Sequence, residues 1–421
     1  METIQYCKKC VTPNTRPRIE FDSEGVCNAC RYAETKRQTD WNAKHRELVE
    51  TVEKYRNKDG TNYDCVIAAS GGKDSHFIAY YVKNILKMNP LCVTFSPSMP
   101  VDVGEKNRRN MVEKIGVDHM LITPNPKVHA QLCKIMLKEH GNVFLPWIQG
   151  IFSAVTKVAV EKNIPLIFYG EDGEAEYGGR NENSKGKFTE SGIRLRVRSS
   201  RPNWKDPENW DQYGFSKKDL IPYISPSDEE VEKAGIRRMF LGSFIPWNNN
   251  QNLHYAMNVI GGFTVLDRRT TGTYTHGISI DDYIDDIYLW FLWPKFGFAR
   301  ATKSASPDIR EGKLTRDNAI ELIRKYDGEF PWYCFDKVLE YLDMSEDEFW
   351  GVVRNFIGDK DNIERERAQA IDSGMSQGEI PNRIPAWIKI GENRWKHAGT
   401  IHGEERVLEL PLKRPDKIDM V

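Results

Sequence analysis

A short glycine-rich loop, placed between a strand-like and a helix-like run, constrains this chain more than any other feature. Residues 63–69 (YDCVIAA) have the pattern of a buried strand, and residues 74–88 have the pattern of a helix. Two consecutive glycines between them let the backbone approach an anion without a Cβ in the way, and the first N–H groups of a helix attract negative charge. A plain turn is the alternative. The context favours a phosphate-binding loop, formed by Ser70, Gly71, Gly72, Lys73, Asp74 and Ser75.

Strand-like and helix-like runs continue to alternate after this loop. Further strand patterns lie at residues 91–95, 119–123 and 165–169, and helical patterns lie at 105–115, 128–140 and 153–163. This alternation predicts an α/β fold, in which helices cover both faces of a parallel sheet. We expect the α/β domain to span residues 41–328, between a cysteine-rich unit (residues 1–40) and a mostly helical C-terminal extension (residues 329–421).

Four of the eight cysteines stand near the start of the chain in two CxxC pairs, as Cys7, Cys10, Cys27 and Cys30. Two such pairs can surround one tetrahedral ion, and four thiolates suit a structural Zn²⁺ site. An iron–sulfur cluster is the alternative, since four cysteines can also hold one. A closed Cys₄ zinc site leaves no position for a substrate, so we expect it to support folding rather than chemistry.

Charge and hydropathy exclude several classes of protein. Lys and Arg number 60 and Asp and Glu number 61, a net charge of −1 that argues against a nucleic-acid or membrane-surface partner. No apolar run approaches the roughly 18 residues of a membrane span. The first residues, METIQYCKKC, lack the apolar region of a secretion signal. We therefore expect a cytoplasmic enzyme.

The loop resembles the SGGxDS loop of the PP-loop ATP pyrophosphatases, and it differs from the GxxxxGK[ST] phosphate loop. That resemblance implies cleavage of ATP between its α and β phosphates. With residues 169–171 (YGE), 176–179 (EYGG) and 295–302 (KFGFARAT), the chain is similar to the N-acetyl sugar amidotransferase family of bacterial surface-sugar biosynthesis. The similarity runs from Cys7 to about Gly328. It implies that a sugar acetamido group becomes an acetamidino group, through transfer of AMP to the amide oxygen and attack by ammonia.

This chemistry implies several partners. The expected substrates are ATP with Mg²⁺ and an N-acetylated sugar, either a nucleotide sugar or a nonulosonic acid. Ammonia must arrive unprotonated, and the cysteines lack a glutaminase-like GxCxG context. We therefore expect a separate glutaminase subunit to supply it.

The resemblance and the strand pattern together suggest roles for particular residues. We expect catalytic roles for Lys73, Asp74, Lys295 and Arg300, with the last two neutralising phosphate charge. Carboxylates suit Mg²⁺, which Asp74 and either Glu171 or Asp172 would bind. Ligands bind outside the carboxyl ends of parallel strands, so the predicted nucleotide contacts also include Thr94, Phe95, Ser96, Gly170, Glu171 and Asp172. The predicted sugar contacts are Tyr177, Gly178, Gly179, Trp247 and Asn248.

Each of these predictions has an alternative. Glu171 and Asp172 could be solvated loop charges, Lys295 and Arg300 surface charges, and residues 247–250 (WNNN) a turn. The aspartates at 281, 282, 285 and 286 fit the start of an ordinary helix better than a metal cluster. At the level of the whole chain, the alternatives are a tRNA-thiolating PP-loop enzyme and a zinc-ribbon interaction protein. The absence of a basic stretch argues against the first, and the intact loop argues against the second.

Overall fold

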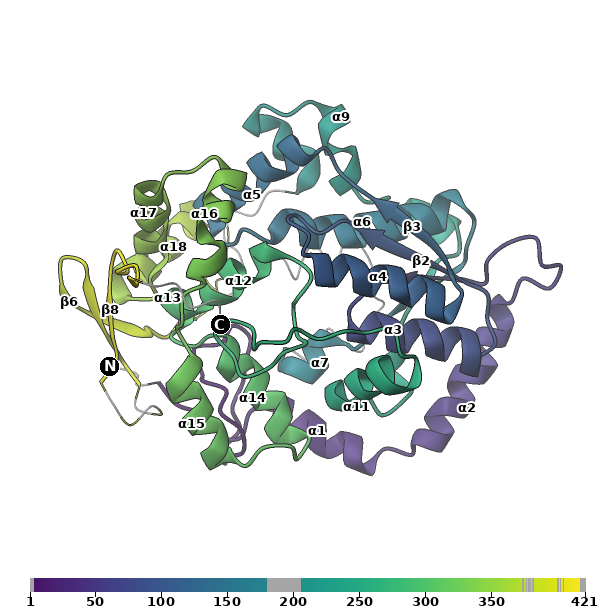
Figure 1. The fold of residues 1–421 in the computed structure, drawn as a ribbon, viewed down its shortest axis with the longest axis horizontal. Coiled ribbons are helices and arrows are strands. Elements are labelled where there is room, and N and C mark those ends of the chain that lie inside the picture. The colour runs from purple at the N-terminus through teal and green to yellow at the C-terminus, as the bar shows by residue number, and fades with distance from the viewer. Residues whose placement is uncertain are drawn as a thin grey trace.

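A parallel five-stranded sheet forms the centre of the computed structural model, which describes residues 4–179, 206–372, 382–399 and 405–416 together with residues 375, 377, 380, 401 and 403 (Figure 1). The strands are β1 (Cys65–Ala68), β2 (Pro90–Phe95), β3 (Asp118–Ile122), β4 (Leu166–Tyr169) and β5 (Arg237–Phe240). Every neighbouring pair is parallel. The predicted α/β class with a parallel sheet is therefore confirmed.

The order of the strands, β3-β2-β1-β4-β5, reverses direction once. The chain builds outward from β1 through β2 to β3, then returns to the other side of β1 to place β4 and β5. The two loops that leave β1 and β4 therefore diverge at the reversal. In open α/β sheets, ligands bind at this switch point, outside the carboxyl ends of the strands.

The alternation of side chains along each strand divides the core into two layers. Val66 joins a cluster with residues of α5 and α6, whereas its neighbour Ile67 joins a cluster with residues of α3 and α4. Both strand residues are fully buried. Successive strand residues point to opposite faces, so an uninterrupted apolar strand needs helices on both sides.

The helices of the first part of the chain carry recognisable end signals. Helix α5 begins with Asn125, whose side chain accepts a hydrogen bond from the N–H of Lys127, and it ends at the left-handed Gly141. The helices are α1 (Asn28–Gln38), α2 (Trp41–Val52), α3 (Lys73–Tyr80), α4 (Asp102–Ile115), α5 (Pro126–His140), α6 (Leu145–Glu161), α7 (Gly173–Tyr177), α9 (Lys217–Leu220), α10 (Asp228–Lys233) and α11 (Asn249–His254). Short 3₁₀ segments lie at Glu53–Tyr55, Pro207–Tyr213, Ile221–Tyr223 and Leu241–Ser243, and π-helical turns at Tyr81–Ile85 and Tyr255–Val259.

The last third of the chain forms a helical layer beside the sheet, followed by a small antiparallel sheet (Figure 1). Its elements are α12 (Tyr283–Trp290), α13 (Leu292–Phe296), α14 (Arg300–Arg310), α15 (Arg316–Tyr326), α16 (Trp332–Leu342), α17 (Glu346–Phe356), α18 (Lys360–Asp372), β6 (Trp387–Gly391), β7 (Arg394–His397) and β8 (Val407–Glu409). An aromatic core holds the layer together, with the rings of Phe330 and Phe335 4.9 Å apart. Cys133 and Leu137 of α5 belong to the same core, so the extension packs on the α/β domain.

Several elements differ from the sequence-based expectation. Strand β5 was not predicted, because RRMF has too few apolar residues to show alternation and lies at an edge of the sheet. Two helices, α1 and α2, rather than one continuous helix connect the cysteine-rich unit to the sheet, since Asp40 caps α2 by accepting a hydrogen bond from Ala43. A third strand, β8, joins the hairpin of β6 and β7. Residues 180–205 lie outside the described residues. No helix in the described ranges is long and apolar enough to cross a bilayer.

Candidate active site

The predicted phosphate loop connects the end of β1 to the start of α3 at the switch point of the sheet. Gly71 has a φ of +91°, and a Cβ there would lie 2.6 Å from the Cα of Arg108 on α4. Only glycine satisfies both constraints. The hydroxyl of Ser75 accepts a hydrogen bond from the backbone N–H of Ser70, and the hydroxyl of Ser70 accepts one from Gly72. The two serines thus brace the turn, while the first backbone N–H groups of α3 remain directed to the loop's mouth.

Lys73 and Asp74 form an ion pair at the first turn of α3, with the lysine Nζ 2.6 Å from an aspartate oxygen. The lysine side chain is 9% exposed and the aspartate side chain is 34% exposed. Two asparagines of α11 complete the group. The Nζ of Lys73 also donates to Oδ1 of Asn249 at 3.1 Å, and Nδ2 of Asn252 donates to Oδ1 of Asp74 at 2.8 Å. The sequence pointed to this segment through WNNN but did not identify these two residues.

The end of β4 places a second carboxylate near the loop. Glu171 accepts a hydrogen bond from the hydroxyl of Tyr177 at 2.8 Å. Burial raises the pKa of Glu171, and the negative charge of Asp74 raises it further. The carboxylates of Asp74 and Glu171 therefore interact electrostatically, and they follow β1 and β4, which are neighbours at the switch point. Asp172 is buried beside them, and its carbonyl accepts a hydrogen bond from Glu176.

The end of β2 lies next to the loop on its other side. The hydroxyl of Thr94 donates to the carbonyl of Ala69, directly before the loop, and lies 2.8 Å from Nε2 of His119. The side chain of Phe95 is buried, and the N–H of Ser96 donates to Ile122 on β3. These three residues lie at the end of β2, beside the loop, where they contact other residues of the protein.

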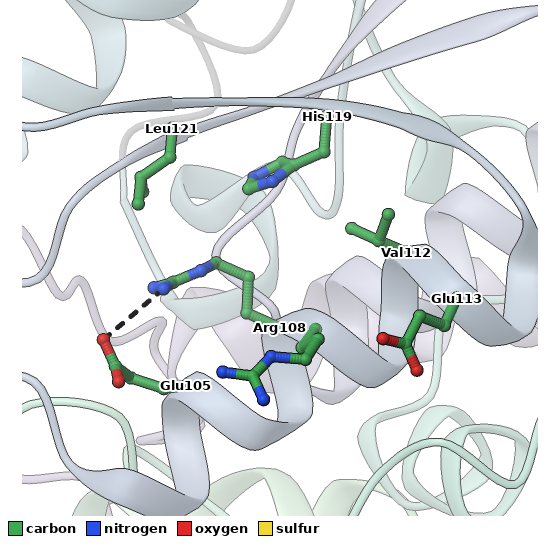
Figure 2. Close-up of a pocket in the computed structure, with 7 residues that line it drawn as sticks. Glu105, Arg108, Val112, Glu113, His119 and Leu121 are labelled. Carbon is green, nitrogen blue, oxygen red and sulfur yellow. Dashed lines mark ion pairs between the residues drawn. The ribbon is translucent and has the colours of Figure 1, made fainter.

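A pocket of about 280 Å³ opens beside this strand end, between α4 and β3 (Figure 2). Its walls are Glu105, Arg108, Arg109, Val112, Glu113, His119 and Leu121. The side chains of His119 and Leu121 point from the strand toward the helix, where Arg108 lies (Figure 2). Because the backbone of Arg108 also packs against Gly71, the pocket adjoins the phosphate loop.

The residues predicted to contact a sugar have other partners in the structure. Trp247 is 3% exposed and packs edge-on against Phe77 in the core, while Gly170 leaves room for its indole. Asn248 caps α11 by accepting a hydrogen bond from Gln251 at 2.8 Å. These two residues thus have structural roles, and their contact with a substrate stays a prediction. The carbonyls of Gly178 and Gly179 accept hydrogen bonds from Arg16 and Asn28 of the cysteine-rich unit.

Lys295 and Arg300 also have structural partners, and the phosphate role predicted for them stays a prediction. The Nζ of Lys295 donates to the carbonyl of His140 at 2.8 Å and lies 5.0 Å from the ring centre of Phe356. Arg300 is 3% exposed, pairs with Asp286, and donates to the carbonyls of Ile278 and Ser279. None of these contacts is with the phosphate loop. The basic side chain that the structure places in the loop is Lys73.

The aspartates before and within α12 serve the fold. Asp282 caps the helix by accepting a hydrogen bond from Ile284, and it also accepts from Ser98 and Met99. Asp286 pairs with Arg300. In the described part of the chain, these aspartates form no cluster close enough to share a metal ion. The interpretation as a helix start is therefore supported.

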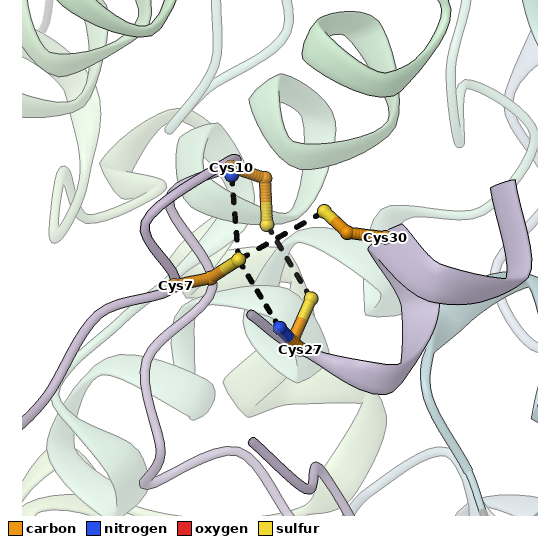
Figure 3. Close-up of side chains that lie close together, drawn as sticks. All are labelled: Cys7, Cys10, Cys27 and Cys30. Carbon is orange, nitrogen blue, oxygen red and sulfur yellow. Dashed lines mark hydrogen bonds between the residues drawn. The ribbon is translucent and has the colours of Figure 1, made fainter. Parts of the chain in front are cut away.

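The four N-terminal cysteines converge on one point, with their Sγ atoms within 4.8 Å of one another (Figure 3). Cys7 and Cys30 are 3.8 Å apart at sulfur, and Cys10 and Cys27 are 3.7 Å apart. A tetrahedron with Zn–S bonds of about 2.3 Å has edges of about 3.8 Å, whereas a disulfide bond is about 2.05 Å long. The backbone N–H groups of Cys10 and Cys27 point at the sulfur of Cys7. Hydrogen bonds from Cys27, Cys30 and Cys7 lower the pKa of Cys10, which favours the thiolate. The donor set fits Zn²⁺.

The cysteine-rich unit packs directly on the segment that follows Glu171. Lys36 of α1 forms a salt bridge with Glu176 at 2.7 Å, and both side chains are less than one-fifth exposed. A Cβ at Gly178 would lie 2.4 Å from Ile19, and this glycine has a φ of +87°. The cysteine site thus supports the same loop that presents Tyr177 to Glu171.

Comparisons with known proteins find a family model and a curated relative that each match part of the chain. A family model described as the C-terminal domain of WbpG-like LPS biosynthesis proteins matches residues 271–373. An uncharacterized protein of Methanocaldococcus jannaschii is 29% identical over 117 residues, which is 28% of this chain and 42% of that protein. The chain therefore spans less than half the length of this curated relative.

Similarity to solved structures is weak. A predicted subunit of a tRNA methyltransferase from Methanocaldococcus jannaschii is 15% identical, with a TM-score of 0.28 over 58% of this chain and 91% of that chain. The NH3-dependent NAD synthetase of Campylobacter jejuni is 13% identical, with a TM-score of 0.25 over 52% and 96%. The NMN synthetase of Francisella tularensis is 11% identical, with a TM-score of 0.25 over 54% and 98%. At these scores, none of the three structures carries an argument about this chain.

The matched segment contains α12 through α18, and it includes Glu311, which accepts hydrogen bonds from Asn249 beside the phosphate loop. Its contact with the loop and its sequence match are independent observations. Residues 271–373 thus match the C-terminal domain of WbpG-like LPS biosynthesis proteins, which agrees with the predicted resemblance to enzymes of bacterial surface-sugar biosynthesis.

Proposed function

We propose that this protein is an ATP-dependent amidotransferase, which converts the acetamido group of a sugar to an acetamidino group. AMP is transferred to the amide oxygen with release of pyrophosphate. Ammonia then attacks the imidate carbon, AMP leaves with the oxygen, and the nitrogen loses a proton. The match to LPS biosynthesis proteins supports a sugar as the acceptor.

One observation carries the proposal. The SGGKDS loop and Glu171 both lie at the point where the strand order reverses. The negative charge of Asp74 raises the pKa of Glu171 there. An anion-binding turn between two facing carboxylates is suited to a nucleotide with a divalent cation.

The donor set at this point fits Mg²⁺, because the negative charge of Asp74 raises the pKa of Glu171, and a cation shared by the two carboxylates would relieve that repulsion. Asp74 and Glu171 would hold the ion, which when bound neutralises charge on the phosphate oxygens. Lys73 adds a fixed positive charge beside the loop, in the role that the sequence also suggested for Lys295 and Arg300. The backbone from Ser70 to Ser75 would hold the pyrophosphate, with the adenosine on the side of Thr94 and the pocket beside Arg108.

The attack of ammonia on the imidate requires further partners. Ammonium is the dominant form of ammonia at neutral pH and is not nucleophilic, so ammonia must be released close to the imidate. We infer a separate glutaminase subunit as its source. The sugar would be a nucleotide sugar or a nonulosonic acid. Zn²⁺ at the four cysteines would hold the loop that carries Tyr177, and would take no part in the reaction.

The proposal is tested by mass spectrometry of products. The purified protein is incubated with ATP, Mg²⁺, ammonium salt at mildly alkaline pH and a panel of N-acetylated nucleotide sugars and nonulosonic acids. We expect AMP to appear in step with a product in which one oxygen has been exchanged for an NH group. Asp74→Asn should abolish both, whereas Asp361→Asn on the exposed face of α18 should leave both unchanged.

Two other outcomes discriminate between hypotheses. AMP formed only with tRNA and a sulfur donor would replace the proposal with the thiolation hypothesis. AMP formed with no change in any sugar, even when a glutaminase and glutamine are added, would leave ATP cleavage established and exclude the amidination of these acceptors.

A further inference from the structure

Helix α11 lies against the phosphate loop and contributes two buried or half-buried amides to it. Asn252 is 1% exposed, and its Nδ2 donates to Oδ1 of Asp74 at 2.8 Å. Asn249 accepts a hydrogen bond from the Nζ of Lys73 at 3.1 Å. These bonds join residues that are 178 and 176 positions apart in the chain. Neither asparagine is part of the SGGKDS motif.

We propose that Asn252 is a positioning residue for Asp74, and that Asn249 is a positioning residue for Lys73, in the ATP-cleaving site. This inference rests on the proposed function, which it deepens by naming what aims the metal-binding carboxylate and the phosphate-binding ammonium.

The surroundings of Asp74 explain why a neutral donor is needed. Asp74 lies in the first turn of α3, where the N–H groups of the helix attract its negative charge. This attraction competes with the attraction between the carboxylate and a cation. One carboxylate oxygen faces Lys73 and the other faces Asn252. An amide fixes the orientation of the carboxylate and adds no charge that would compete with a cation. Because Asn252 is almost fully buried, its own position is set by packing.

The surroundings of Asn249 fix the direction of its amide. Its Nδ2 and its backbone N–H both donate to Oε1 of Glu311, at 3.3 Å and 3.1 Å. The carbonyl oxygen of the amide must then face Lys73, where it accepts a hydrogen bond. Among the residues that the structure describes, the ammonium of Lys73 has Asp74 and Asn249 as partners, and its third donor is available to a phosphate oxygen.

Glu311 connects this arrangement to the second half of the chain. It follows α14 within the WbpG-like segment, and its other oxygen accepts a hydrogen bond from Asn250 at 2.7 Å. The path from Glu311 through Asn249 to Lys73 is the contact by which the WbpG-like domain fixes the geometry of the nucleotide loop. Glu311 is therefore expected to act through Asn249 and not on substrate.

The test measures metal binding directly, apart from turnover. The full-length protein is mixed with α,β-methylene-ATP, which blocks cleavage at the α–β bond, and free Mn²⁺ is counted by electron paramagnetic resonance. Asn252→Ser and Asn252→Leu both remove the amide, the first by shrinking the side chain and the second by replacing the amide with an apolar group of the same branching. We expect either change to weaken Mn²⁺ binding about tenfold or more, since hydrogen bonds to charged groups contribute about 1.5–3 kcal/mol. Asn258→Ser, on the exposed turn after α11, is the matched control and should bind Mn²⁺ as the unchanged protein does.

A double-mutant cycle separates positioning from general damage to the fold. In an Asp74→Asn background, Asn252→Ser should cause no further loss of Mn²⁺ affinity, because its target is already gone. Asn249→Ala should weaken binding of inorganic pyrophosphate, and should do so no further in a Lys73→Ala background. Circular dichroism identifies the folded variants, and Asn252→Ser carries the test if Asn252→Leu does not fold.

Two results would overturn the inference. Mn²⁺ affinity within about twofold of the unchanged protein in a folded Asn252 variant would exclude the role of Asn252. Equal losses with and without the Asp74 substitution would indicate a general structural effect. Failure of the proposed function is distinguishable, because an unchanged protein that forms no acetamidino sugar can still show the coupled loss of Mn²⁺ binding.

Discussion

Tyr177 donates a hydrogen bond over 2.8 Å to Oε1 of Glu171, at a position where burial raises the pKa of both groups. The tyrosine is followed by Gly178 and Gly179, whose carbonyls accept hydrogen bonds from the cysteine-rich unit. A short path therefore joins the four cysteines to a carboxylate at the nucleotide loop. The predicted zinc unit is part of the architecture of the site, even though its closed coordination leaves it without chemistry.

Replacing Tyr177 with phenylalanine should weaken the binding of Mg²⁺ by Glu171 without disturbing the shape of the site. Glu171 would lose its hydrogen-bond donor at a half-buried position, where a hydrogen bond to a charged group contributes about 1.5–3 kcal/mol. We expect the Mg²⁺ concentration for half-maximal AMP formation to rise about tenfold, a change that corresponds to about 1.4 kcal/mol. Tyr213→Phe removes a hydroxyl from another Tyr–Glu pair, with Glu139, and should leave the Mg²⁺ dependence unchanged. Equal Mg²⁺ dependence in the two variants would contradict the role of Tyr177.

A methyl group at Gly71 should destroy the loop, whereas the same change one residue later should be tolerated far better. Gly71 has a φ of +91°, and a Cβ would lie 2.6 Å from the backbone of Arg108. Strain in such a position costs about 1–3 kcal/mol before the clash is counted. Gly72 has a φ of −70°, and a Cβ there would meet only Ser70 Oγ at 3.3 Å. Gly71→Ala should lower the free energy of unfolding measured in urea and abolish binding of pyrophosphate. Gly72→Ala should largely keep both the stability and the binding. Similar behaviour of the two variants would mean that the loop is not shaped by this contact.

Much of the site could be predicted from short stretches of sequence. The loop, the strands beside it and the carboxylates after β4 follow from local patterns and from the rule that strand ends meet at one edge. The four cysteines are equally local, since their spacing is the spacing of two metal-binding turns. These elements were placed correctly because no distant residue is needed to define them.

The residues that the sequence did not identify depend on contacts across the chain. In WNNN and the residues that follow it, the roles depend on where α11 begins. Asn248 is the cap, so Asn249 and Asn252 face the loop and Trp247 enters the core. Lys295 and Arg300 lie in the KFGFARAT motif, which predicted contacts with phosphate. Their hydrogen-bond partners come from α5 and from the segment before α12. A sequence motif identifies charged residues, but the partners of those charges are determined by the packing of distant segments.

Metal analysis should find one zinc ion per chain, bound by the four cysteines. Cys27→Ser should lose the ion, because it removes one of four thiolates that meet within 4.8 Å. Cys334→Ser is the matched control, since Cys334 is buried in the aromatic core of the extension. We expect the first variant to lose both zinc and the thermal stability that metal binding supplies, and the second to keep the ion. Iron with the visible absorption of a cluster would instead support the alternative cofactor.

Substitution of Arg300 should reduce stability rather than catalysis alone. Arg300 and Asp286 are a buried pair, with side chains 4% and 5% exposed. Removing one partner of such a pair costs about 3–5 kcal/mol, because the other charge stays buried without compensation. Arg300→Met should therefore lower the free energy of unfolding by this amount, and Arg300→Met combined with Asp286→Leu should recover part of it. A variant Arg300→Lys that keeps full stability but forms AMP about a hundredfold more slowly, equivalent to about 2.7 kcal/mol, would restore the catalytic role predicted from the sequence.

His129 should make the fold sensitive to mild acid. Its ring is 2% exposed, lies 2.9 Å from the hydroxyl of Ser98 and 2.8 Å from that of Tyr223, and burial lowers its pKa to about 4. Between pH 6.5 and pH 4, the folded state therefore binds fewer protons than the unfolded state, and stability falls as the pH falls. The contribution is fully present above pH 6.5, and about 3 kcal/mol is lost by pH 4. Asp282, whose pKa is raised to about 6 by burial, acts in the opposite direction, but it is present in every variant.

Urea unfolding at several pH values should thus show a flatter profile for His129→Gln than for the unchanged protein, while His276→Gln, at an exposed position, keeps the original slope. Parallel profiles for His129→Gln and the unchanged protein would mean that this histidine is not held neutral by the fold.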